Sequence, residues 1–177
     1  MKKLLLFCCV MLNLPVAAQA AEEKIDPAAY ICAELVAIGV SGQPPLFEGL
    51  QIDGYAAAAQ GATVADPPIM APLLEQVYAA CQAKPTEKVV TLWQEARKKQ
   101  TVADDAPWRA DKTTCRQYSE NEDDGSGFVI WLDGYNRQKS GKLDSVLESD
   151  DTLRAYLDAC ANHPEKLMID VMRESVK

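Results

Sequence analysis

The feature that most constrains the fold is an internal repeat with a period of about eighty residues. Residues 52–55 (Ile-Asp-Gly-Tyr) recur at 132–135 as Leu-Asp-Gly-Tyr, and Gly61 recurs as Gly141. Further pairs follow at slightly different offsets, namely Leu74, Ala80, Cys81 and Pro85 with Leu153, Ala159, Cys160 and Pro164, and Cys32 with Cys115. Small changes of offset are expected where loops of different length join equivalent elements. The repeat therefore predicts a duplicated domain, with copy one at 21–100, a polar linker at 101–107 and copy two at 108–177.

The first twenty residues have the pattern of a secretory signal peptide. Lys2 and Lys3 precede an apolar run at 4–12, and the small-residue site Ala18-Gln19-Ala20 follows. A basic start, a short apolar segment and an A-x-A site are typical of an export signal, and the run is too short for a membrane anchor. We expect cleavage between Ala20 and Ala21. No other segment approaches a transmembrane length, so the sequence predicts a soluble periplasmic protein.

The cysteines predict one disulfide in each copy. Cys8 and Cys9 lie inside the predicted signal peptide, which leaves Cys32, Cys81, Cys115 and Cys160. An even number in an exported chain indicates two bridges, although four cysteines allow three pairings. The repeat places two cysteines in each copy and so favours Cys32–Cys81 and Cys115–Cys160. A zinc site is disfavoured, because no two of these cysteines are close in sequence and His163 is the only histidine.

The apolar periodicity is helical throughout and predicts an all-α fold with four helices in each copy. In copy one, Asp26-Pro27 should open a helix over 28–37, and a second helix over 46–60 should end at Gly61. In copy two, one apolar helix face carries Phe128, Trp131, Leu132 and Tyr135.

The third helix of each copy should carry Cys81 or Cys160 on its apolar stripe, facing the first helix. Pro85 and Pro164 should end these helices and begin the fourth ones. Glycine in the middle of a helix costs about 1 kcal/mol relative to alanine. The glycine of each Asp-Gly-Tyr step therefore indicates a close approach between helices.

Charge limits the kinds of partner. The chain has 26 Asp and Glu against 18 Lys and Arg, a formal charge of −8. The predicted signal peptide holds two of the lysines and no acid, so the exported chain would carry −10. An acidic chain without a basic stripe argues against binding to nucleic acid or to an anionic membrane surface.

No set of residues predicts catalysis, and we expect no cofactor and no metal. The acidic run at 120–125 resembles a calcium loop, but it begins with Glu120, and Trp131 stands where the closing carboxylate is required. A solvated loop before a helix with an acidic first turn is the favoured interpretation. His163 is expected at the surface of a helix end. Asp53 and Asp133 recur, but no pattern predicts that they share a catalytic cleft, so the expectation is a protein that is not an enzyme.

Copy two resembles the HdeA/HdeB family of periplasmic acid-stress chaperones. The resemblance rests on Trp-Leu-Asp-Gly-Tyr-Asn-Arg-Gln at 131–138 and on Cys-Ala-Asn-His-Pro at 160–164, after an opening cysteine at 115. The cysteine separations in the two copies are close to that of the family's single bridge. Copy one is similar more weakly, with Gln51 in the place of Trp131. The resemblance implies a small helical fold stapled by one disulfide in each copy.

The resemblance also implies an acid-activated holdase. Family members are folded and inactive near neutral pH, often as dimers, and in acid they open and bind unfolded or acid-damaged periplasmic proteins. Carboxylates titrate near pH 4, so in strong acid the exported chain would move from −10 towards about +17. Because family members are usually single domains, the tandem form predicts that activation becomes separation of the two copies. Self-association is a further possibility.

Two other hypotheses assign the chain to a different functional class of protein. One is a periplasmic binding or immunity-type protein that neutralises a single protein partner, such as a secreted hydrolase. The other is a structural envelope protein. The holdase hypothesis predicts apolar exposure in acid, whereas the immunity hypothesis predicts tight co-purification of one partner at neutral pH.

Overall fold

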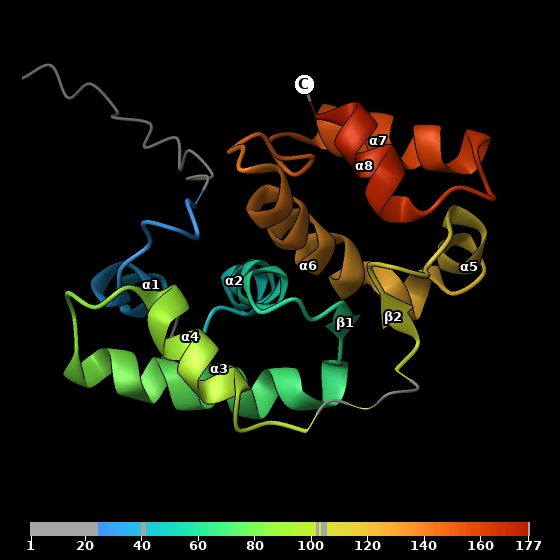
Figure 1. The fold of residues 1–177 in the computed structure, drawn as a ribbon. Helices are drawn as coiled ribbons and strands as arrows, with labels where there is room; N and C mark the ends of the chain where they lie inside the picture. The colour runs from blue at the N-terminus through green and yellow to red at the C-terminus, as the bar shows by residue number, and fades with distance from the viewer. Residues whose placement is uncertain (1–24, 40–41, 102, 104–105, 177) are drawn as a thin grey trace, which may run out of the picture.

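The computed structural model describes residues 25–39, 42–101, 103 and 106–176, and these residues are predominantly helical (Figure 1). The predicted signal peptide and its cleavage site lie outside the described residues. Copy one forms α1 (Cys32–Ile38), α2 (Leu46–Ala59), β1 (Val64–Ala65), α3 (Pro67–Ala83) and α4 (Val89–Arg97). Copy two forms β2 (Trp108–Arg109), α5 (Cys115–Ser119), α6 (Glu122–Ser140), α7 (Asp150–Asn162) and α8 (Met168–Ser175). Within the described ranges the all-α prediction, with four helices in each copy, is confirmed.

The two predicted disulfides are present. Cys32–Cys81 joins α1 to α3, and Cys115–Cys160 joins α5 to α7, with sequence separations of 49 and 45 residues. All four cysteines are buried. Each bridge therefore fastens the first helix of a copy to its third helix, inside the apolar core of that copy.

The first helix of copy one begins later than predicted. The segment after Asp26 forms a turn, in which the Asp26 side chain accepts a hydrogen bond from the Ala28 amide at 3.0 Å. Ile31 is extended and pairs with Lys88, so α1 begins only at Cys32. The same pairing joins Thr114 to Leu167 in copy two.

The same backbone pairing explains why Pro85 and Pro164 do not begin the fourth helices. Their carbonyl oxygens accept hydrogen bonds from the amides of Ala33 and Arg116, at 2.8 and 2.9 Å. The residues after each proline therefore run against the start of the first helix, and α4 and α8 begin four residues later. The acidic run also differs from the prediction, because α6 already begins at Glu122. The carboxylates of Glu122 and Asp123 thus lie at a helix N-terminus, where negative charge is favoured.

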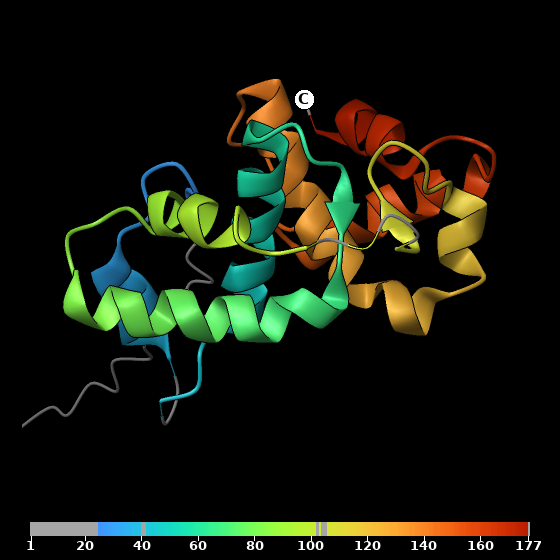
Figure 2. The same ribbon diagram turned by 60° about the horizontal axis from the view of Figure 1, so that its bottom comes forward.

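The two copies meet along α2 and α6. Figures 1 and 2 show these helices side by side, with α1, α3 and α4 on one side and α5, α7 and α8 on the other. They contact each other more extensively than any other pair of elements in the described residues. A short antiparallel pairing of β1 with β2, Val64 with Arg109 and Ala65 with Trp108, also crosses between the copies. Strands of two residues are too short to leave an alternating pattern, so the sequence analysis did not predict them.

None of the helices in the described part of the chain is both long and apolar enough to cross a membrane.

Replacing both cysteines of one bridge by serine should destabilise the fold strongly. A bridge that closes a loop of 45 or 49 residues disfavours the unfolded chain by about 4 kcal/mol on the chain-entropy estimate. Urea unfolding of Cys32→Ser/Cys81→Ser and of Cys115→Ser/Cys160→Ser measures this loss, and the two variants should lose similar amounts because the loops are similar. A loss below about 1 kcal/mol in both variants would contradict this role of the bridges.

Candidate functional site at the interface between the copies

The two Asp-Gly-Tyr steps meet where α2 crosses α6. A Cβ atom placed on Gly54 would lie 1.9 Å from the backbone oxygen of Trp131, and one on Gly134 would lie 2.0 Å from that of Gln51. No side chain fits in either place, so the predicted close approach of helices is confirmed. Gln51 and Trp131 occupy equivalent positions in the repeat, as do the two glycines. The contact is therefore reciprocal, like the self-complementary interface of a twofold dimer.

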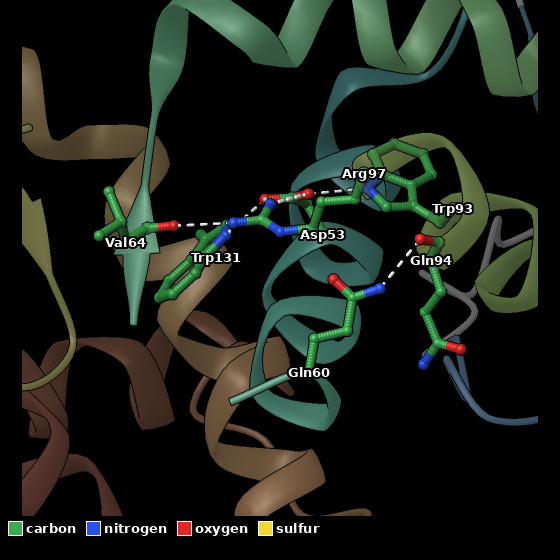
Figure 3. A network of polar contacts seen from close by, with 7 residues as sticks. All are labelled: Asp53, Gln60, Val64, Trp93, Gln94, Arg97 and Trp131. Atoms are coloured by element: carbon green, nitrogen blue, oxygen red, sulfur yellow. Dashed lines mark hydrogen bonds and ion pairs between the residues drawn. The ribbon is translucent and has the colours of Figure 1, made fainter. Parts of the chain in front are cut away.

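Asp53 lies at the centre of a fully buried polar network (Figure 3). Its carboxylate accepts hydrogen bonds from the indole Nε1 of Trp93 at 2.8 Å and of Trp131 at 2.7 Å. Arg97 Nη1 binds both carboxylate oxygens, and Arg97 Nη2 donates to the carbonyl oxygen of Val64 at 3.0 Å. One carboxylate thus connects α2 and α4 of copy one, strand β1 through the guanidinium, and α6 of copy two.

Asp133 is the equivalent of Asp53, but its partners are neutral. It accepts hydrogen bonds from Gln51 Nε2 at 3.2 Å, from Ser145 Oγ at 2.8 Å and from the Val146 amide at 3.1 Å. Burial raises the pKa of this carboxyl above its ordinary value, opposed by the hydrogen bond from Ser145 and by the charge of Arg137. The Gln51–Asp133 bond mirrors the Trp131–Asp53 bond across the crossing point.

The difference between the two aspartates originates in the fourth helices. Because Leu167 takes the pairing position of Lys88, Met172 corresponds to Trp93 and Val176 corresponds to Arg97. Copy two therefore lacks the indole and the guanidinium that hold Asp53 in copy one. The duplicated scaffold thus pairs the aspartate with a guanidinium in one half and with neutral hydrogen-bond donors in the other.

Arg137 is a second buried cation at this interface. Only 2 % of the residue is exposed, and its Nη2 donates to the carbonyl oxygen of Ile25 at 2.8 Å. Among the described residues, its Nε and Nη1 have no hydrogen-bond partner. Arg137 lies one helical turn after Asp133, and through Ile25 it connects α6 to the segment that precedes α1.

The sequence analysis missed the roles of Arg97, Arg137, Gln51 and Ser145. One signal for Arg97 was available, since it follows Trp93 by four residues and so lies on the same buried face of α4. Gln51 left no such signal because its partner Asp133 lies in the other copy, and Ser145 left none because it lies in a loop twelve residues after Asp133. The structure also brings Asp53 and Asp133 into one interface, which no pattern predicted, and hydrogen-bond donors surround both carboxylates.

The remaining predicted residues lie apart from this interface. His163 is exposed at the C-cap of α7. In the part of the chain that the structure describes, no group of three His, Cys, Asp or Glu side chains is placed to hold a metal ion.

No family model, no curated protein and no solved structure matches this chain. The similarity to the HdeA/HdeB family therefore stays a prediction from the residues quoted above.

Alanine at Gly54 should force α2 and α6 apart. The added Cβ would meet backbone rather than a flexible side chain, so the expected destabilisation is about 1–3 kcal/mol, although alanine favours a helix by about 1 kcal/mol. Gly127→Ala on α6 is the matched control, because its Cβ would lie 3.4 Å from the nearest atom of Leu50. Thermal unfolding should show a loss for the first variant and none for the second. Equal effects would contradict the close approach.

Asp53→Asn should be strongly destabilising at neutral pH. It leaves the guanidinium of Arg97 buried without a counter-charge, which typically costs about 3–5 kcal/mol. Asp53→Asn/Arg97→Met should lose less than the single variant, because it removes the stranded charge. Urea unfolding of the two proteins gives the comparison. A double variant that is less stable than Asp53→Asn would contradict this account of the pair.

Asp133 should make the fold relatively more stable in mild acid. Because burial raises its pKa, the folded chain binds a proton there at a pH where the unfolded chain has released it. Its contribution therefore grows as the pH falls towards the ordinary value of about 3.9 and is lost as the pH rises. Asp133→Asn cannot ionise and should lack this dependence. The free energy of unfolding of the natural chain minus that of the variant should increase from neutral to mildly acidic pH, and a constant difference would refute the prediction.

Proposed function

We propose that this chain is a periplasmic acid-stress chaperone, a holdase that opens at low pH and keeps acid-damaged proteins from aggregating. On this proposal it has no enzymatic activity. The observation that carries the proposal is the interface between the copies, where a buried ion pair lies beside a large apolar surface.

A holdase needs apolar surface that it can expose to its clients, and this interface buries such a surface. A row of stacked rings runs from Trp108 on β2 through Phe128 and Trp131 to Tyr135 on α6, with centroid separations of 5.4, 5.9 and 5.3 Å. The apolar core of copy two also includes Ala57 and other small residues of copy one. Separation of the copies would therefore uncover surface that both cores now share.

Acid acts on the charged network in the required direction. Protonation of the Asp53 carboxylate would leave the Arg97 guanidinium buried without a counter-charge, which favours opening. The growing positive charge of the whole chain adds self-repulsion. Asp133 works the other way, since its raised pKa makes its protonation stabilising, so we assign the opening to Asp53–Arg97. The two disulfides would keep each copy from unfolding completely.

The test follows aggregation of an acid-labile client protein through a shift to about pH 2.5, where carboxylates are neutral, and back. Binding of a dye to exposed apolar surface is measured in parallel. The natural chain should suppress aggregation only after the shift to acid, and reduction of its disulfides should abolish the effect. A chain that stays compact and leaves aggregation unchanged in acid would contradict the proposal.

A variant comparison tests the assigned trigger. Asp53→Asn should bind the dye at a higher pH than the natural chain, because its interface lacks the ion pair from the start. Asp151→Asn is the control, since the Asp151 side chain is 93 % exposed and lies outside the interface. Identical dye titrations for both variants would exclude Asp53 as the trigger.

A further inference from the structure

The first turn of α2 forms an apolar ridge on the surface. Leu46 and Phe47 are 55 % and 45 % exposed, and they are two of the four large apolar side chains exposed in the described part of the chain. A hollow lies on each side of them, one lined by Leu46 and Leu50 and the other by Phe47 and Gln51. We name this area, Leu46, Phe47 and the two hollows, the ridge surface.

The first hollow has a volume of about 280 Å³ and is almost entirely apolar. Its wall includes Leu50 and Met70 from copy one, and Trp108 and Phe128 from copy two. The one charged group in the wall is Asp66, which is only 5 % exposed and accepts a hydrogen bond from the Ala103 amide at 3.2 Å. The hollow is at the lower end of the size of ligand pockets and suits a single large apolar side chain.

The second hollow has a volume of about 350 Å³ and combines apolar with acidic groups. Phe47, Leu147 and Leu153 supply apolar surface, and Glu48 and Asp150 supply carboxylates. No Lys or Arg among the described residues lines either hollow. The ridge surface is therefore apolar at the first hollow and carries negative charge at the second hollow.

We propose that the ridge surface binds a polypeptide segment that carries large apolar side chains next to Lys or Arg. The apolar side chains would enter the two hollows, and the basic side chains would meet the carboxylates of Glu48 and Asp150 at the second hollow. Complementary charge of this kind selects partners and disfavours those of the wrong sign. The inference goes beyond the proposed function, because both hollows are built from the two copies together and need the closed, neutral-pH interface.

The test measures fluorescence anisotropy of a short dansyl-labelled peptide of alternating Leu and Lys, added to the full chain at neutral pH. A peptide of alternating Leu and Glu is the charge control. The Leu–Lys peptide should bind at least about tenfold more tightly, a difference of about 1.4 kcal/mol. Salt should weaken its binding, because Asp150 at the second hollow is exposed and Glu48 is partly exposed.

Two variants locate the binding. Leu46→Ser/Phe47→Ser removes the ridge, and Gly127→Leu places a side chain in the first hollow, where a Cβ meets only Leu50 at ordinary distance. Both should weaken peptide binding by about tenfold or more. Leu143→Ser is the matched control, because Leu143 is 56 % exposed and lines neither hollow. Circular dichroism checks that all three variants stay folded.

Three results would overturn the inference. The Leu–Lys peptide could fail to bind, both peptides could bind equally well, or Leu143→Ser could weaken binding as much as Leu46→Ser/Phe47→Ser does. A dimer of the natural chain, seen by light scattering and lost in the ridge variant, would make a second copy the occupant instead. None of these results depends on acid activation, so the inference and the proposed chaperone function fail separately.

Discussion

The ion pair between Asp53 and Arg97 is the interaction on which the rest of the structure depends. A carboxylate with no exposure to water needs a full set of donors, and Asp53 obtains them from two indoles and one guanidinium. These donors come from both copies, so satisfying the charge requires that α2 and α6 pack together. The close crossing at Gly54 and Gly134 makes this possible, because any side chain there would separate the helices.

The duplication has produced two halves with one scaffold and different chemistry. In both halves an aspartate on the central helix accepts a hydrogen bond from the other half. Asp53 accepts it from Trp131, and Asp133 accepts it from Gln51. In copy one the fourth helix adds Trp93 and Arg97, whereas in copy two Met172 and Val176 fill the same places with apolar groups. The interface thus holds one aspartate paired with a buried guanidinium and one aspartate whose pKa is raised by burial.

Much of the fold was predictable, because the information was local or repeated. The repeat identified the disulfide pairing, and glycines in the middle of predicted helices indicated the close approach of α2 and α6. The start of α1 was predicted wrongly, since Ile31 takes its extended conformation from Lys88, a partner far away in the sequence. The roles of Arg97 and Gln51 were missed for the same reason. A buried polar residue is recognised by its partners, and these become neighbours only after folding.

On the proposed function, the α2–α6 interface closes the molecule at neutral pH and opens in acid. Hydrogen exchange measured by mass spectrometry, corrected for the intrinsic exchange rate at each pH, tests it without any label. At neutral pH the central amides of α2 and α6 should be among the slowest to exchange. At about pH 2.5 both helices should lose protection together, while the helices joined by the disulfides retain more of theirs. Undiminished protection of α2 and α6 in acid would contradict the account.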